Sequence, residues 1–152
     1  MHDDMGRPKS RIVRTTMSDP VIDSTASARL KVGPFDLASA LNFEPGDVFP
    51  PVFATSRMVA LMEVAAARVL GPHLGAGELS VGASLEVVHT AATPPGATVT
   101  ATAKFVGKEG KLFLFELSAA DDAGEIGRGT HKRAIVNADR IVAGAARRGP
   151  QA

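Results

Sequence analysis

One long apolar segment, residues 56–70, most restricts how this chain can fold. It contains no glycine or proline, and Gly71-Pro72 follows it, which predicts a helix that ends there. Between residues 58 and 67, Glu63 alone is charged, so the helix is apolar around its whole circumference. Such a helix has to be covered by other parts of the structure. Just before it, Thr55 is placed to be its N-cap.

Four strand-like segments follow the predicted helix. Apolar and polar side chains alternate along each of them, as in a strand with one buried face. Short turns rich in glycine, proline and aspartate separate them, which predicts four sequential antiparallel neighbours. The segments span residues 79–91, 97–106, 111–120 and 125–136, and a further alternating segment at 28–32 predicts a first strand.

The apolar surface that could cover the helix is one face of this sheet. We therefore predict an α+β fold in which a curved antiparallel sheet of about five strands wraps one long central helix. From the pattern alone, this is one of several α+β arrangements. Ahead of the helix, residues 35–43 predict one or two helical turns, and the proline-rich residues 44–52 predict a loop.

The length of 152 residues suits one domain, which we place at residues 27–140. Residues 1–26 are polar and without period and predict a disordered leader, and residues 141–152 predict a fraying tail. The charges, 17 basic and 16 acidic, give no reason to expect nucleic acid as a partner. No apolar segment approaches the length of a membrane span and no secretory signal is present, so we expect a cytoplasmic protein.

The absence of cysteine excludes disulfides, thiol catalysis and cysteine-based zinc sites. His73 and His131 are isolated in the sequence, and no metal-ligand spacing emerges, so we expect no metal. Lys132 and Arg133, near the end of the last strand, could meet a phosphate or lie in solvent.

Glu63 and His89 are the candidates for acid–base chemistry. A lone carboxylate on an apolar helix is costly unless it is paired, functional or close to the edge of the helix. His89 continues the alternation of Val81, Ala83, Leu85 and Val87 and so points toward the helix; a histidine there is more often part of the core than a catalyst. If His89 shares a layer with Glu63, the two could form an acid–base pair.

Thr55 could position a carbonyl or a water beside the free N–H groups of the helix start. Eight residues separate it from Glu63, which is about 12 Å of helix rise. Either the helix start is irregular, or one site combines groups from two copies of the chain.

Three blocks of the sequence carry a family resemblance: residues 52–55 with 58–63, residues 81–82 through 89–96, and residues 122–127 with 129–133. Within the second block, His-Thr-Ala-Ala-Thr-Pro-Pro-Gly at residues 89–96 is the most distinctive. The blocks resemble the fluoroacetyl-CoA thioesterase-like family of hot-dog proteins, and the resemblance covers about residues 28–140.

The resemblance implies a hot-dog fold, a homodimer, and hydrolysis of an acyl-CoA thioester without a cofactor. The family's catalytic threonine, glutamate and histidine fall on Thr55, Glu63 and His89. A glycine and an arginine that contact substrate or CoA fall on Gly82 and Arg133, and we expect Arg133 to meet a CoA phosphate.

The predicted loop departs from the family at one position. Members specific for fluoroacetyl-CoA carry two phenylalanines in a lid before the threonine; one matches Phe49, but the other position holds Gly46. A broader enzyme for short acyl-CoAs is therefore at least as well supported. Two alternatives stay open: a hot-dog enoyl-CoA hydratase or dehydratase, and a non-catalytic acyl-CoA binding module.

Overall fold

The computed structural model describes residues 18–150. Within them, five strands and two α-helices form the framework, and three short 3-10 helices lie in the connections. The elements, in chain order, are β1 (Thr25–Lys31), η1 (Pro34–Asp36), η2 (Ala38–Leu41), α1 (Thr55–Leu70), η3 (Gly71–His73), β2 (Glu78–His89), β3 (Thr98–Glu109), β4 (Leu112–Asp121), β5 (Gly124–Asn137) and α2 (Ala138–Arg147).

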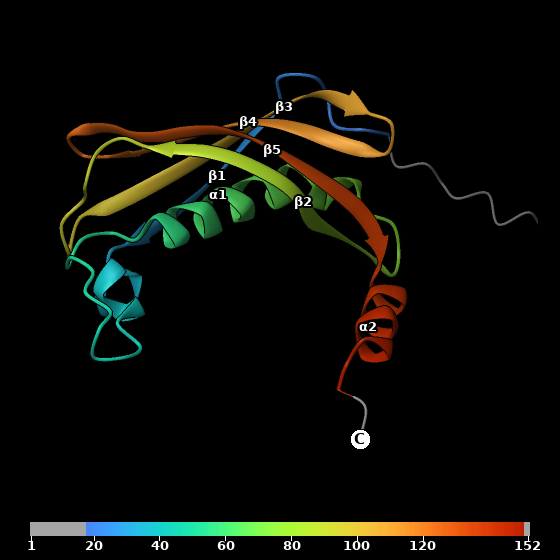
Figure 1. The fold of residues 1–152 in the computed structure, drawn as a ribbon. Coiled ribbons are helices and arrows are strands. Elements are labelled where there is room, and N and C mark those ends of the chain that lie inside the picture. The colour runs from blue at the N-terminus through green and yellow to red at the C-terminus, as the bar shows by residue number, and fades with distance from the viewer. Residues whose placement is uncertain (1–17, 151–152) are drawn as a thin grey trace, which may run out of the picture.

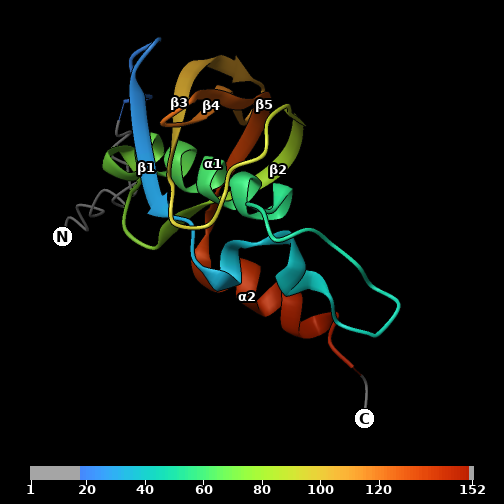
Figure 2. The same ribbon diagram turned by 90° about the vertical axis from the view of Figure 1, so that its left-hand side faces the viewer.

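The strands form one antiparallel sheet in the order β1-β3-β4-β5-β2. The sheet curls over α1, which lies along its concave face (Figure 1). The view from the side shows the sheet closing around the helix (Figure 2). The predicted wrapping of one long helix by a curved sheet is thereby confirmed.

The strand order differs from the prediction at β2. This strand pairs with β5 and not with β3, so the four strands are not all sequential neighbours. The connection at residues 90–97 crosses the end of the sheet instead of forming a hairpin. Thr93 anchors it: this residue is fully buried, its hydroxyl donates to Asp121 at 2.7 Å, and its carbonyl accepts from the Phe53 N–H.

The core lies between α1 and the centre of the sheet. The predicted alternation in β3 and β4 is confirmed, because every second side chain in each strand is buried against the helix. Burying a side chain of leucine or phenylalanine size stabilises the fold by about 1.5–3 kcal/mol. The buried residues of the two strands are Val99, Ala101, Ala103, Phe105, Phe113, Phe115, Leu117 and Ala119.

A single chain does not cover α1 on all sides, although the sequence pattern requires such cover. Its sheet-facing side is buried, but Val64 on the far side is 43% exposed, and the Glu63 side chain is 42% exposed. The neighbouring edge strand β2 leaves Leu79 and Val88 more than half exposed as well. An apolar helix face and a strand edge thus remain uncovered in the single chain.

A bulge in β2 changes which of its side chains face α1. The pairing with β5 shifts between Gly82 and Ser84, so the extra residue reverses the alternation. Leu85 packs against the core as predicted, but Gly82 also faces the helix. The prediction that Val81 shares the face of Leu85 is therefore wrong.

The two ends differ from the prediction in different ways. Residues 141–147 belong to α2 and are not a fraying tail; the Asn137 side chain caps this helix by accepting from the Arg140 N–H. β1 begins at Thr25, inside the predicted leader, whose residues 1–17 lie outside the described residues. Over residues 18–150, no helix is long and apolar enough to cross a membrane.

Candidate active site

The start of α1 and the end of β2 bring Thr55 and His89 together. Thr55 Oγ1 and His89 Nδ1 form a hydrogen bond of 2.8 Å. The predicted capping role of Thr55 is wrong, because the N-cap is Ala54 and Thr55 is the first helical residue. The Thr55 hydroxyl is instead hydrogen-bonded to the imidazole of His89, which is an arrangement suited to acid–base chemistry.

A hollow of about 380 Å³ lies beside this pair. His89 Nε2 is buried and has no hydrogen-bond partner, the one such side-chain atom found in residues 18–150. A buried polar atom without a partner is costly unless a ligand or water satisfies it. The hollow is lined by Ala38, Pro50, Val52, Phe53, Thr55, His89, Thr90, Ala91 and Ala92.

Glu63 lies in a second cluster, on the middle of α1. Its Oε1 accepts from Arg133 Nη1 at 3.2 Å and lies 4.0 Å from His131 Nε2. Gly82 makes room for this carboxylate: a Cβ on Gly82 would overlap Glu63 Oε1. The predicted importance of Gly82 thus has a local reason, which is close packing of the carboxylate on the β2 backbone.

Arg133 is buried within this cluster, with 6% exposure, and does not lie at a solvated strand end. Its Nε donates to Ser80 Oγ at 3.1 Å, its Nη2 to the Ser80 carbonyl at 3.0 Å, and its Nη1 to His131 Nε2 at 3.1 Å. Burial lowers the pKa of Arg133, and the adjacent Glu63 opposes this shift. Internal partners hold the guanidinium in this way within the chain, and the expected contact of Arg133 with a CoA phosphate stays a prediction.

His131 is the member of the cluster that the sequence did not single out. It is 2% exposed, and its Nδ1 lies 2.8 Å from the Ser84 carbonyl. Burial is the main cause that lowers its pKa, Arg133 adds to the lowering, and the Ser84 carbonyl and Glu63 oppose it. The alternation of the last strand, followed from Gly129 through His131 to Arg133, would have placed it on the helix-facing side.

The two clusters lie far apart in one chain. Gly82 and His89 pair with Arg133 and Gly127, which are six positions apart on β5, about 20 Å of extended strand. Thr55 and Glu63 are correspondingly about 12 Å apart along α1. Glu63 and His89 therefore do not share a layer within a single chain: His89 pairs with Thr55, and Glu63 pairs with Arg133.

The segment between β1 and α1 is anchored at its base and exposed at its tip. Arg57 forms a salt bridge of 2.8 Å with Asp36, and Leu37 pairs with Phe53. Phe49 is 44% exposed, its N–H donates to Asn42, and it is not among the residues that line the hollow. Its part in substrate binding stays a prediction.

Comparison with known proteins decides the family. The sequence model of the fluoroacetyl-CoA-specific thioesterases matches residues 36–139. The chain belongs to this family. The fluoroacetyl-CoA thioesterase of Streptantibioticus cattleyicolor is 50% identical over 93 residues, which cover 61% of this chain and 67% of that protein.

Solved structures agree with this membership. The fluoroacetyl-CoA thioesterase FlK superimposes with a TM-score of 0.81 at 39% identity, over 86% of this chain and 98% of that one. A thioesterase superfamily member from Thermus thermophilus gives a TM-score of 0.75 at 28% identity, over 84% of this chain and 91% of that one. The predicted hot-dog fold and the predicted thioesterase class of this family member are confirmed.

Proposed function

We propose that this chain hydrolyses short acyl-CoA thioesters to a carboxylic acid and free CoA, with Thr55, Glu63 and His89 as its working residues. One observation carries the proposal: the Thr55–His89 pair borders a hollow and leaves His89 Nε2 buried without a partner. A thioester carbonyl or the attacking water would supply that partner. Among relatives, one variant of FlK has been solved with acetyl-CoA, and another with fluoroacetate and CoA.

Glu63 supplies the carboxylate that starts the reaction. As a general base it takes a proton from water while the water oxygen attacks the thioester carbon. As a nucleophile, one of its oxygens forms the new bond and water then hydrolyses the mixed anhydride. In both routes the carbon–sulfur bond breaks and the CoA sulfur leaves as a thiolate, which His89 can protonate. Thr55 orients the carbonyl or the water.

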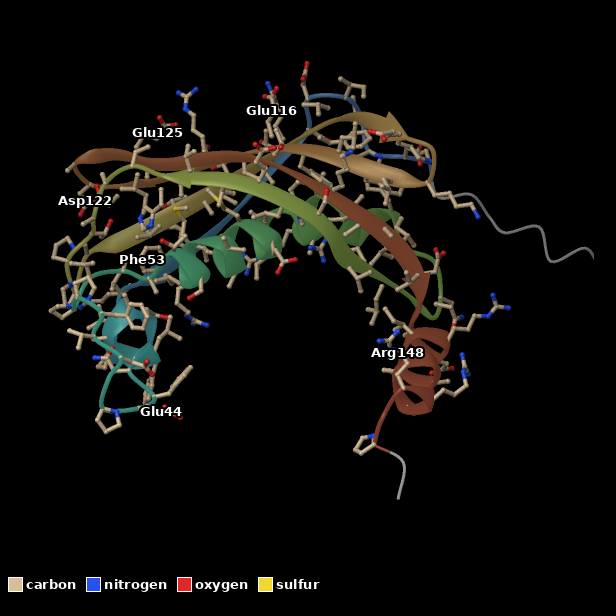
Figure 3. The ribbon with its side chains drawn as sticks, viewed as in Figure 1. Glu44, Phe53, Glu116, Asp122, Glu125 and Arg148 are labelled. Carbon is tan, nitrogen blue, oxygen red and sulfur yellow. The ribbon has the colours of Figure 1, made fainter. Side chains whose placement is uncertain are left out.

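The two clusters have to meet for this chemistry, and we propose that a second copy of the chain brings them together. The exposed side of α1 carries both Glu63 and Val64, and the β2 edge beside it is unpaired within residues 18–150. This exposed face of α1 lies on the concave side of the sheet, the side of Glu44 and Arg148. The convex side, which carries Glu116 and Glu125, faces away from it (Figure 3). A homodimer would cover the apolar helix face.

Light scattering during size-exclusion chromatography tests the homodimer. We expect a particle of twice the chain mass of 15.7 kDa. A particle with the mass of one chain at assay concentration would contradict the two-copy site.

For the acyl group, we propose a short chain without strict selection for fluorine. The segment over the hollow carries Phe49, half exposed, but Gly46 where fluoroacetyl-specific members have a second phenylalanine. A lid with one aromatic ring excludes water less completely and contacts the acyl group less closely. We also propose a cytoplasmic location, because acyl-CoA is an intracellular substrate class.

The test of the reaction is thiol release from acetyl-, propionyl-, butyryl- and fluoroacetyl-CoA by the wild type and by Glu63→Gln. We expect release by the wild type and its loss in the variant. A hydratase or dehydratase would convert an enoyl-CoA without releasing thiol. A binding module would bind these compounds tightly and release none; either result would contradict the proposal.

A further inference from the structure

The buried imidazole of His131 has a defined protonation state. Its Nδ1 lies 2.8 Å from the Ser84 carbonyl, which can only accept, so Nδ1 carries the proton. Arg133 Nη1 lies 3.1 Å from Nε2 and can only donate, so Nε2 accepts from it and carries no proton. The neutral ring is held between a backbone carbonyl on β2 and a guanidinium on its own strand.

Arg133 Nη1 is shared between two acceptors. One of its hydrogens is directed to His131 Nε2 and the other to Glu63 Oε1, at 3.1 and 3.2 Å. Ser80 holds the other nitrogens of the guanidinium through its hydroxyl and its carbonyl. His131, together with Ser80, thus fixes the nitrogen from which Glu63 receives its hydrogen bond.

Glu63 needs such support because its side chain is 42% exposed. A glutamate on a helix surface samples several rotamers unless a partner selects one. The fixed nitrogen of Arg133 selects one, and the absence of a Cβ at Gly82 leaves room for it.

We propose that neutral His131 is a positioning residue for the hydrolytic reaction: it aims Arg133 Nη1 at Glu63 and so holds the carboxylate in its working orientation. This inference rests on the proposed function, in which Glu63 acts on the thioester. His131 acts through Arg133 and is not itself a catalytic residue.

Protonation of His131 would disrupt the arrangement. Imidazolium donates from both nitrogens, so Nε2 could no longer accept from Arg133, and two cations would lie side by side. The charged groups that face the ring are Glu63 from α1 and Arg133 from β5; β2 presents the Ser84 carbonyl and β4 presents Phe115. Because burial lowers the pKa of His131, activity should hold through neutral pH and fall in acid, below 6.5.

The experiment compares three variants by kcat, KM and the pH profile of kcat. His131→Leu removes the acceptor, and we expect kcat to fall at least about 10-fold with KM changed less than about 3-fold. His131→Gln offers an amide oxygen near the place of Nε2 but does not titrate; we expect it to restore most of kcat and to lose the acidic limb that belongs to His131. His73→Leu, which changes a histidine outside both clusters, is the matched control and should behave as the wild type.

Failure of this inference and failure of the proposed function give different results. If Glu63→Gln abolishes thiol release but His131→Leu retains kcat, the positioning role is overturned while the reaction stands. If the wild type releases no thiol, urea unfolding of His131→Leu, Glu63→Gln and the double variant still tests whether His131 and Glu63 are coupled. Shifts in midpoint that are not additive support the coupling of His131 to Glu63, and additive shifts overturn it.

Discussion

The exchange of Gly82 for alanine would displace the Glu63 carboxylate without changing its chemistry. The added Cβ would overlap Glu63 Oε1 and lie 3.2 Å from Cε1 of His131. To reach an ordinary contact distance, the carboxylate oxygen has to move by about 1 Å. A displacement of about 1 Å in a catalytic group costs about 100-fold in rate, or about 2.7 kcal/mol of transition-state stabilisation.

The stability of the Gly82→Ala variant should change little. The displaced atom is the end of a flexible, partly exposed side chain, so relaxation of that chain avoids strain in the core. We therefore expect kcat/KM for acetyl-CoA to fall about 100-fold while the urea midpoint stays close to that of the wild type.

Two glycines provide matched controls. Gly71→Ala adds a Cβ with no atom within 4 Å and should leave both activity and stability unchanged. Gly129→Ala adds a Cβ that overlaps the Glu86 carbonyl oxygen, a backbone atom that cannot turn away, and should lower the urea midpoint strongly. A Gly82→Ala enzyme with wild-type kcat/KM would refute the reasoning.

Three more outcomes follow from the contacts. Thr93→Val deletes the buried hydrogen bond to Asp121 and should lower the free energy of unfolding by about 1.5–3 kcal/mol, as measured in urea; an unchanged midpoint would show that the crossing connection is held by other contacts. Phe49→Ala should leave the urea midpoint unchanged because the ring is half exposed, and should raise KM for acyl-CoA if the ring contacts the acyl group. As pH falls below 6.5, the urea midpoint of the wild type should fall relative to that of His131→Gln. The reason is that a histidine with a lowered pKa stabilises the fold only while it stays neutral. A constant difference between the two midpoints would contradict the burial of a neutral ring.

Local sequence patterns predicted the elements of this fold well. The helix ends where glycine and proline follow it, and the alternation in β3 and β4 identified their buried faces, because both signals depend on residues close in the chain. The strand order was predicted less well, since the pairing of β2 with β5 depends on a connection anchored by Thr93 to a distant aspartate. No signal within residues 90–97 distinguishes a crossing from a hairpin.

The candidate site was likewise predicted in its residues but not in its arrangement. Thr55, Glu63 and His89 stood out by residue type and family resemblance, but their grouping could not be predicted. One bulged residue in β2 determines that Gly82 faces Glu63, and a bulge leaves no reliable mark in the sequence. Arg133 looked like a strand end and His131 like an isolated histidine, although the alternation from Gly129 through His131 to Arg133 would have placed both on the helix-facing side.

The central claim is that Glu63 of one chain completes the Thr55–His89 pair of another. Mixing Thr55→Ala and Glu63→Gln chains after unfolding and refolding them together tests it directly by thiol release from acetyl-CoA. If sites combine two chains, half of the dimers are mixed and each has one intact site of two, so activity should return to about one quarter of the wild-type level. Activity no greater than that of the two variants refolded separately would contradict the claim.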